Sequence, residues 1–315
     1  MTETAIQAYP TTRAYRTRVA RISQLSEHFV RFTFTDGDLR HFGTGGLDQR
    51  IKLMIPRADG TLPEVGLFTE PAPPMMEWYT RWRELPEAER NAMRTYTVRD
   101  IRPEDREVDI DFVLHGTEGP ASAWAMGAGV GDEMVIIGPD ERSETGGRGR
   151  SGGIEWDPGE ARTVLLVGDE TAAPAICSIL ETLGAEYSGH VFIEVPGAAD
   201  ILPVDTNAAV QLNWLARGDR PHGEVLTEAV QAWGREYGAE VAGSGASETA
   251  LAEVDPEATL WDVPPESPHG HWYAWLAGEA GAITGLRRHL VKSLGIDRKC
   301  VSFMGYWKQG RAEGS

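Results

Sequence analysis

The sequence predicts two domains, an N-terminal antiparallel β-barrel followed by an α/β domain built on a parallel sheet. Its 315 residues exceed the length that a single hydrophobic core usually serves. Residues 14–142 alternate apolar and polar side chains with the period of strands, whereas strand-like and helix-like runs alternate after residue 162. We therefore expect domains at residues 1–142 and 161–315, joined by a linker at residues 143–160.

Six short alternating runs, each bounded by Gly, Pro, Asp or Asn, predict the barrel. They are residues 15–23, 28–34, 49–56, 94–101, 107–115 and 133–139. Residues 70–93 interrupt this rhythm with a proline-rich turn and then a predicted helix. We expect that insertion to lie outside the barrel.

The linker is rich in glycine and has no apolar periodicity, which is typical of an exposed loop. Its glycines do not form a phosphate-binding P-loop, because no G-K-[ST] follows them and no strand precedes them as that motif requires.

Strands at 162–168, 190–195, 210–217 and 271–278, with helices at 171–184, 223–237 and 281–295, make up the predicted α/β domain. In the last helix Ile283, Leu286, Leu290 and Leu294 form one apolar stripe that faces a sheet. The acidic segment 238–268 lacks this patterning and is predicted to be a long surface loop.

The charge distribution argues against nucleic-acid binding, because the formal net charge is −18 and phosphate neutralisation needs a basic face. Positive charge gathers instead in residues 286–311, where anions would be favoured. Cys177 and Cys300 lie in apolar surroundings that suit free thiols in a reducing compartment. With no apolar leader-like or membrane-spanning run, we expect a cytoplasmic protein, a monomer with no membrane partner.

The run RTYTVR, residues 94–99, combines side chains that suit a long ligand. In a strand Arg94, Tyr96 and Val98 point to one side, and Thr95, Thr97 and Arg99 point to the other. An aromatic ring beside a guanidinium suits a flat ligand with a phosphate tail. Spacing alone also fits an ordinary barrel strand with a surface arginine and a half-buried tyrosine.

A second motif, HGTEGPASAWA at residues 115–125, predicts a turn followed by a helix start. Amide groups at a helix start donate readily to phosphates, and Ser122 adds a hydroxyl. An ordinary helix N-terminus with proline in its first turn fits equally well. His115 either faces a ligand or has a structural role.

Two turns of the second domain, VGDETAAPA at 167–175 and AGEAGAITG at 277–285, follow strands at the edge where open α/β sheets bind ligands. Plain strand-to-helix packing is the alternative, and neither turn is G-x-G-x-x-G. No metal site is predicted, because His269 and His271 lack the ligand spacing of zinc or iron sites. Asp109 and Asp111 alternate with Ile110, as on the outer face of a strand.

Lysine is scarce, which makes Lys52 in RIKLMIP a candidate to hold an anionic ligand. A strand-face lysine in water is the alternative. Arg81 and Arg83, on the insertion, are weaker candidates for the same role.

The motifs RTYTVR, HGTEGPASAWA, VGDETAAPAI and WLAGEAGAITGLRRHL occur in this order across residues 94–290. From about residue 15 to 308 the chain resembles the siderophore-interacting protein family of ferric-siderophore reductases, flavoproteins built like ferredoxin-NADP reductase. The glycine-rich linker and the acidic loop depart from that family's pattern.

The resemblance implies that FAD binds the barrel. Arg94 would hold the pyrophosphate, Tyr96 would pack on the isoalloxazine and Thr97 would hydrogen-bond near N5. Val98 and Arg99 would contact the pyrimidine edge. The turn would complete the diphosphate site, with these residues: His115, Gly116, Gly119, Pro120, Ala121 and Ser122.

The resemblance also implies that the second domain binds NADH or NADPH through the turn residues Gly168, Asp169, Glu170, Thr171 and Ala172, and later through Gly278 and Glu279. Tyr306 and Trp307 would lie near the flavin, or pack in the core. No arginine cluster lies next to Glu194 in the sequence that follows it, VPGAAD, which favours NADH, although Arg217 or Arg220 would suit a 2′-phosphate.

The function implied is reduction of a ferric siderophore, anionic and of catecholate type, held by Lys52 and Arg81. Tyr96 and Thr97 are the expected catalytic residues. Two alternatives stay open: a flavin reductase that serves a ferredoxin, and a siderophore-binding protein without flavin.

Overall fold

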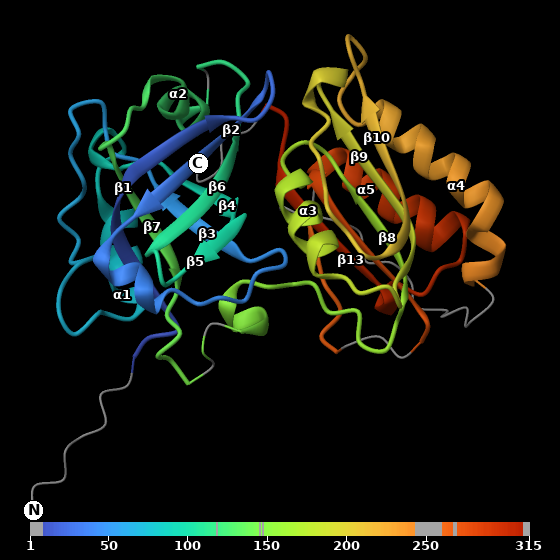
Figure 1. The fold of residues 1–315 in the computed structure, drawn as a ribbon, viewed down its shortest axis with the longest axis horizontal. Coiled ribbons are helices and arrows are strands. Elements are labelled where there is room, and N and C mark those ends of the chain that lie inside the picture. Colours follow the sequence, from blue (N-terminus) through green and yellow to red (C-terminus); the bar gives the residue numbers. More distant parts are fainter. Residues whose placement is uncertain are drawn as a thin grey trace, which may run out of the picture. The chain divides into compact units, whose positions relative to one another are not determined.

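The computed structural model describes residues 9–117, 119–144, 146, 148–242, 260–266 and 270–310. These residues form two compact units (Figure 1). The first comprises residues 9–24 and 29–154, and the second comprises residues 25–28 and 155–310. Each unit has its own sheet and its own apolar core.

The first unit is a seven-stranded antiparallel sheet with strand order β4-β3-β7-β1-β2-β6-β5. All six predicted runs contain strands, and the run 94–101 splits into two. The strands are β1 (Thr12–Gln24), β2 (Phe29–Thr35), β3 (Arg50–Met54), β4 (Met93–Thr97), β5 (Asp100–Arg102), β6 (Glu107–Val113) and β7 (Glu133–Pro139). A 3₁₀ turn (η1, Gly37–His41) and helix α2 (Pro120–Gly127) complete the unit's connections.

The two edge strands of this sheet, β4 and β5, are consecutive in the chain and are separated only by Val98 and Arg99. The Val98 amide donates to Gln49 O at 2.9 Å, and the Arg99 amide donates to Asp109 O at 2.8 Å. The first bond contacts the residue before β3, near one edge of the sheet, and the second contacts β6, near the other edge. The sheet must therefore curl until its edges meet at this dipeptide.

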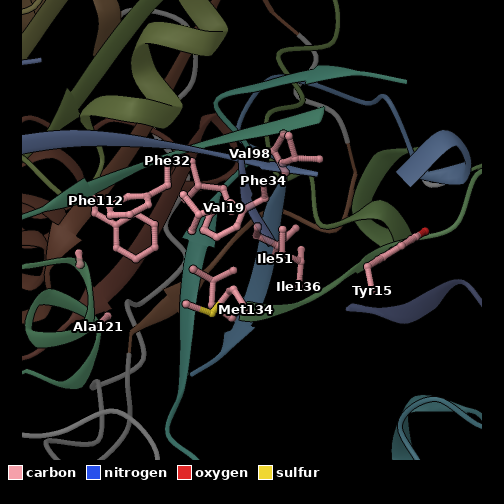
Figure 2. Close-up of a cluster of buried hydrophobic side chains, with 14 of the residues drawn as sticks. Tyr15, Val19, Phe32, Phe34, Ile51, Val98, Phe112, Ala121, Met134 and Ile136 are labelled. Atoms are coloured by element: carbon pink, nitrogen blue, oxygen red, sulfur yellow. The ribbon is translucent and has the colours of Figure 1, made fainter. Parts of the chain in front are cut away.

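Alternate side chains fill the inside of the curl, as the period of a strand requires. Phe32 and Phe34 of β2 lie with Phe112 of β6 among the fully buried side chains, and Val98 closes the cluster (Figure 2). The same cluster takes Ala121 from α2, so this short helix is fixed to the sheet by apolar contact.

The insertion forms helix α1 (Met75–Glu84) and a 3₁₀ turn (η2, Glu87–Glu89). The predicted helix is confirmed, and it packs on the sheet. Trp78 and Trp82 are buried against Met54, Met93 and Ile137, on the face opposite the inner cluster.

The prediction of an exposed linker at 143–160 is wrong in part. Ile154, Glu155 and Trp156 are buried, and a 3₁₀ turn (η3, Gly149–Gly152) precedes them. The carbonyl of Gly153 accepts from the Arg50 amide at 2.7 Å. Gly153 has a φ of +84°, and a Cβ there would lie 2.4 Å from Arg50 O, so only glycine allows this approach. Thr145 and Gly147 lie outside the described residues.

The second unit is a six-stranded sheet with order β10-β9-β8-β12-β13-β11. Its strands are β8 (Thr163–Gly168), β9 (Ser188–Val195), β10 (Ala209–Ala216), β11 (Trp261–Asp262), β12 (Trp272–Glu279) and β13 (Val301–Trp307). Five of them are parallel, but β11 pairs antiparallel with β13. The sheet is thus mixed, and sequence patterning missed β11 and β13.

Within the described residues, three helices cover this sheet: α3 (Ala173–Thr182), α4 (Glu224–Ala242) and α5 (Ala280–Arg288), the last continued by a π-helical turn (η5, His289–Ser293). Helices α4 and α5 share one core cluster, and α3 lies on the other side of the strands (Figure 1). Short 3₁₀ turns occur at Ala198–Asp200 (η4) and Arg298–Cys300 (η6).

The apolar stripe predicted for the last helix is confirmed. Ile283, Leu286 and Leu290 are fully buried, and Leu294 packs against their cluster. The predicted acidic surface loop is corrected at both ends, because residues 238–242 belong to α4 and Trp261–Asp262 forms β11. Residues 243–259 and 267–268 of that segment lie outside the described residues.

Two further expectations concern the cysteines and the membrane-spanning helices. Neither Cys177 nor Cys300 forms a disulfide in the described part of the chain. Among the helices that the structure describes, none is both long enough and apolar enough to cross a bilayer.

Trp78 is expected to anchor α1, because its side chain is only 1% exposed. Replacing Trp78 with Ala should lower the stability of the first unit by roughly 3–5 kcal/mol through cavity formation. Met76, on the same helix, is 67% exposed, and Met76→Ala should change it by less than about 0.5 kcal/mol. Denaturant unfolding of the two variants checks this, and equal losses would contradict the packing of α1.

Candidate functional site

Strand β4 carries the first candidate site, and its pairing with β3 decides which side chains share a face. Arg94 lies opposite Leu53 and Tyr96 lies opposite Ile51, while Thr95 lies opposite Lys52. Because paired residues point to the same face, Arg94 and Tyr96 lie on the face of Leu53 and Ile51, which belong to the inner cluster. The structure thus brings these two predicted residues together.

Tyr96 lies at the margin of the inner cluster. Its ring centroid is 4.5 Å from that of Phe112, with the planes tilted by 36°, and the residue is only half-buried. Arg94 is also half-buried, and its Nη1 donates to Met93 O at 2.9 Å. A ring supported from behind and a partly exposed guanidinium two residues away fit a flat ligand with an anionic tail.

The three residues after Tyr96 are tied to the sheet. Thr97 is buried and lies opposite Arg50. The amide hydrogens of Val98 and Arg99 are taken by Gln49 and Asp109, so they are not available to a ligand. The Arg99 side chain lies 3.8 Å from Asp111, a buried carboxylate.

Asp109 and Asp111 lie on the face opposite Ile110, as predicted, but arginines bury them. Arg102 donates to Asp109 at 2.8 and 3.0 Å, and Arg31 donates to Asp111 at 2.6 and 2.9 Å. These ion pairs lie between neighbouring strands of the sheet, Arg31 and Asp111 across β2 and β6, and Arg102 and Asp109 across β5 and β6.

The turn before α2 has a defined shape. The Ser122 hydroxyl donates to Gly116 O at 2.7 Å and accepts from the His115 amide at 3.0 Å, and its residue is fully buried. A Cβ on Gly119 would lie 2.7 Å from His115 Cε1, so the ring covers that glycine. Ser122 thus shapes the turn.

The start of α2 has no side-chain cap. Gly119 is its N-cap residue and Pro120 follows in the first turn. The amide groups of a helix's first turn have no partner within the helix, so this uncapped start, with Ala121 behind it, suits an anion.

Lys52 lies on the opposite face of the sheet from Arg94 and Tyr96. Its Nζ donates to Thr95 Oγ1 at 2.5 Å, and it is in register with Ile137, which packs beneath α1. Arg81, on α1, donates to Val65 O at 3.1 Å and pairs with Glu77. The two predicted substrate residues therefore share a face, and it is not the face of Tyr96.

The second candidate site lies at the carboxyl edge of the second sheet, where open α/β sheets bind ligands. All five parallel strands contribute to it. The contributing residues are Asp169 and Glu170 after β8, Glu194 in β9, Arg217 after β10, Glu279 at the end of β12 and Trp307 at the end of β13.

Asp169 joins three of these strand ends. Its Oδ1 accepts from the amide and hydroxyl of Thr171 at 2.9 and 2.5 Å. Its Oδ2 accepts from the Glu279 amide at 2.7 Å and from Trp307 Nε1 at 2.9 Å. Gly278 permits this approach, because a Cβ there would lie 2.6 Å from Oδ2. Burial, with the charge of Glu170, raises the pKa of Asp169.

Glu170 pairs with an arginine and a histidine. Arg217 donates to both of its oxygens, at 2.9 and 2.8 Å, and His222 Nε2 lies 3.1 Å from Oε2. Burial works against the charged carboxylate, but these partners outweigh it and lower the pKa of Glu170. Glu279, by contrast, caps α5 by accepting from the Ala282 amide at 2.8 Å.

Glu194 is fully buried and caps α4. It accepts from the amides of Gly223 and Leu226 at 2.8 and 2.9 Å. Arg220 pairs with Glu224 and Glu228 at 2.8 and 2.6 Å. Glu194 and Arg220, which were considered for the choice between NADH and NADPH, thus already have protein partners.

Other predicted residues have structural surroundings. Thr171 bonds to Asp169, and Ala172, at the start of α3, is fully buried. Tyr306 packs between Trp261 and Trp275, with centroids 6.2 Å away in each case, so it belongs to the sheet's aromatic packing. Trp307 instead faces the network at the carboxyl edge.

His222 and the pairing role of Arg217 were not predicted. Both come from loops about fifty residues after Glu170, and only the strand order brings them to it. Asp169, Glu170 and His222 are also close enough together to resemble a metal site. However, Asp169 already accepts four hydrogen bonds, and Arg217 occupies both oxygens of Glu170, so we describe this group as a hydrogen-bond network. His269 lies outside the described residues.

Glu170 should stabilise the second unit in a pH-dependent way. Because its pKa is lowered on folding, its contribution is present above the ordinary value of 4.5 and is lost as pH falls through the lowered value. Glu170→Gln should cost about 3 kcal/mol at neutral pH, and less in acid.

Glu224→Gln, at an exposed ion pair, is the matched control and should cost less than about 1 kcal/mol. Unfolding free energies of both variants between about pH 7 and about pH 3 check this. A Glu170→Gln loss that stays constant with pH would contradict the pairing.

Comparison with known proteins agrees with this two-part organisation. Residues 18–143 match the siderophore-interacting FAD-binding domain, and residues 161–310 match the siderophore-interacting protein family. An uncharacterized protein from Mycobacterium tuberculosis is 34% identical over 232 residues, 73% of this chain and 70% of the relative. The ferric vibriobactin reductase ViuB of Vibrio cholerae is 26% identical over 294 residues, 93% of this chain and 89% of ViuB.

Solved structures give the same answer. The siderophore-interacting protein SipS from Aeromonas hydrophila is 27% identical, with a TM-score of 0.65 over 96% of this chain and 95% of SipS. A ferredoxin NADP+ reductase from Neisseria gonorrhoeae shares the fold, with a TM-score of 0.54 over 94% of this chain and 99% of that chain, at 10% identity. The chain belongs to the siderophore-interacting protein family.

Proposed function

We propose that this protein binds FAD on its first unit and uses NADH or NADPH, bound by its second unit, to reduce a ferric siderophore. The main support is that Arg94 and Tyr96 lie on the same face of β4, within a domain that matches the siderophore-interacting FAD-binding family. The similarity to ViuB, a ferric vibriobactin reductase, extends over 93% of the chain and supports the same reaction.

The residues of the first unit fit FAD. Tyr96 offers a supported ring face, Arg94 offers a partly exposed guanidinium, and the uncapped start of α2 suits a diphosphate. Since Ser122 is fully used within the turn, the helix amides rather than this hydroxyl would meet the phosphates. Thr97 points to the opposite face of the strand from Tyr96, and it would hydrogen-bond near N5 of the flavin.

The chemistry supplied by FAD, when it is bound, would be the conversion of a two-electron hydride donor into one-electron reduction of Fe(III). The chain itself would bind and orient. Arg94 would neutralise the diphosphate, and Tyr96 would fix the ring plane. Neither unit needs to offer an acid or base for reduction of the iron. Ferrous iron binds hard oxygen ligands more weakly than ferric iron, so reduction would release the metal.

The nucleotide would lie at the carboxyl edge of the second sheet, against the turn Gly168–Ala172 and Glu279. We expect NADH to be preferred to NADPH. Arg217 is held by Glu170 and Arg220 by two carboxylates, so a 2′-phosphate would have to compete for both. Glu194 does not enter this argument, because it caps α4.

The iron complex is the substrate, and an anionic siderophore would suit Lys52 and Arg81. These residues share one face of the first unit, and that face is not the face of Tyr96. Lys52 and Arg81 would therefore dock the siderophore rather than contact the flavin.

The purified protein should be yellow, and NADH should drive reduction of ferric siderophores in a ferrozine assay that traps Fe(II). Catecholate and hydroxamate complexes should be compared. A colourless protein that binds siderophores would instead indicate a binding protein, and reduction of a ferredoxin in preference to every siderophore would indicate a ferredoxin-linked reductase.

Arg94 and Tyr96 should determine flavin content. The double variant Arg94→Ala, Tyr96→Ala should purify without flavin absorbance, because it loses the diphosphate partner and the ring face. Tyr96→Phe keeps the ring and should stay yellow, which separates loss of stacking from loss of fold. Full flavin absorbance in a folded double variant, verified by circular dichroism, would refute the assignment.

Lys52→Ala should raise the KM for an anionic ferric siderophore by roughly tenfold, as expected for loss of one charge-assisted contact. The rate at which NADH bleaches the flavin should not change. Lys292→Ala, on the second unit, is the control and should leave both unchanged. Unaltered siderophore kinetics in Lys52→Ala would remove this lysine from the site.

A further inference from the structure

His222 occupies a position between the acidic side chains at the carboxyl edge of the second sheet. Its Nε2 lies 3.1 Å from Glu170 Oε2 and 3.9 Å from Asp169 Oδ2, and its Nδ1 lies 3.9 Å from Glu194 Oε1. The imidazole thus faces three carboxylates, which come from the β8 turn and from β9. Its side chain is only 11% exposed.

The end of β13 packs against the same imidazole. The ring centroids of His222 and Trp307 are 4.8 Å apart, with the planes at 90°. Trp307 is also bonded to Asp169 through its indole N–H. The position of Trp307 therefore depends on both Asp169 and His222.

The charges around His222 favour its protonated form. Asp169, Glu170 and Glu194 face it with negative charge, and Arg217 is the cation that pairs with Glu170 beside it. Burial favours the neutral imidazole, but the Glu170 hydrogen bond and the attraction of Glu170 and Asp169 outweigh burial and raise the pKa of His222. Three acids next to one arginine leave a net negative group, and a positive charge on His222 reduces that excess without cancelling it.

We propose that protonated His222 is a positioning residue that holds Glu170 and Trp307 in the arrangement that binds nicotinamide nucleotide. This inference rests on the proposed function, because it assumes that the carboxyl edge of the second sheet is the nucleotide site. His222 need not touch the nucleotide. Its proton keeps Glu170 and Asp169, two adjacent buried acids, from repelling each other, and its ring supports Trp307.

The direction of the pH effect follows from the raised pKa. The contribution of protonated His222 is complete below the ordinary value of 6.5 and is lost as pH rises through the raised value. The KM for NADH should therefore rise with pH in that window by roughly five- to tenfold, the effect of losing a charged hydrogen bond. The kcat at saturating NADH should change little.

Two variants separate charge from structure. His222→Gln keeps a hydrogen-bond donor without charge, so its KM for NADH should stay at the high-pH value of the wild type. His222→Lys keeps a cation, so its KM should stay near the low-pH value. His190→Gln, in the same unit and next to Tyr237, is the control and should keep the wild-type pH profile.

Steady-state kinetics with NADH as the probe should be combined with NMR titration of histidine ring protons, in which His222→Gln identifies the His222 signal. The signal should titrate above 6.5. A midpoint at or below that value, in a protein that oxidises NADH, would overturn this inference alone. A wild-type pH profile in His222→Gln would also overturn it. Failure of the wild type to oxidise NADH at any pH would refute the proposed function itself.

Discussion

The carboxylate of Asp169 is the interaction on which the second unit's functional edge depends. It accepts four hydrogen bonds, and these come from its own turn, from the end of β12 and from the side chain that ends β13. In a parallel sheet the strands' carboxyl ends meet at one edge but are not joined by the ladder beyond the last residue. Here the buried Asp169 connects the strand ends, and it can approach because Gly278 has no Cβ.

In the first unit an equivalent constraint is covalent. The strand that carries Arg94 and Tyr96 runs through Val98 and Arg99 directly into the opposite edge of the sheet. The same few residues therefore hold the candidate ligand side chains and close the curled sheet. This explains why the peptide groups of Val98 and Arg99 are used by the fold, while the side chains of Arg94 and Tyr96 stay partly exposed.

Sequence patterning predicted most strands and helices, because their apolar periodicity is strong. It failed at β13, whose residues include Gly305 and follow a basic helix, and at the two-residue β11. Turns that follow strands were found, so Asp169 and Glu279 were predicted. The partners His222 and Arg217 depend on the order β10-β9-β8, and the face of Lys52 depends on which strand pairs with β3. Neither follows from local pattern.

Glu194 illustrates what this dependence means for redesign of coenzyme preference. It lies one residue before the end of β9, the strand next to β8, where an acid commonly recognises a ribose, and it would be the first position that an engineer replaces. Yet its carboxylate is the acceptor for two amides at the start of α4. An exchange there would unravel the first turn of a nineteen-residue helix before it altered selectivity. Libraries should be directed instead to the exposed carboxylates that hold Arg220.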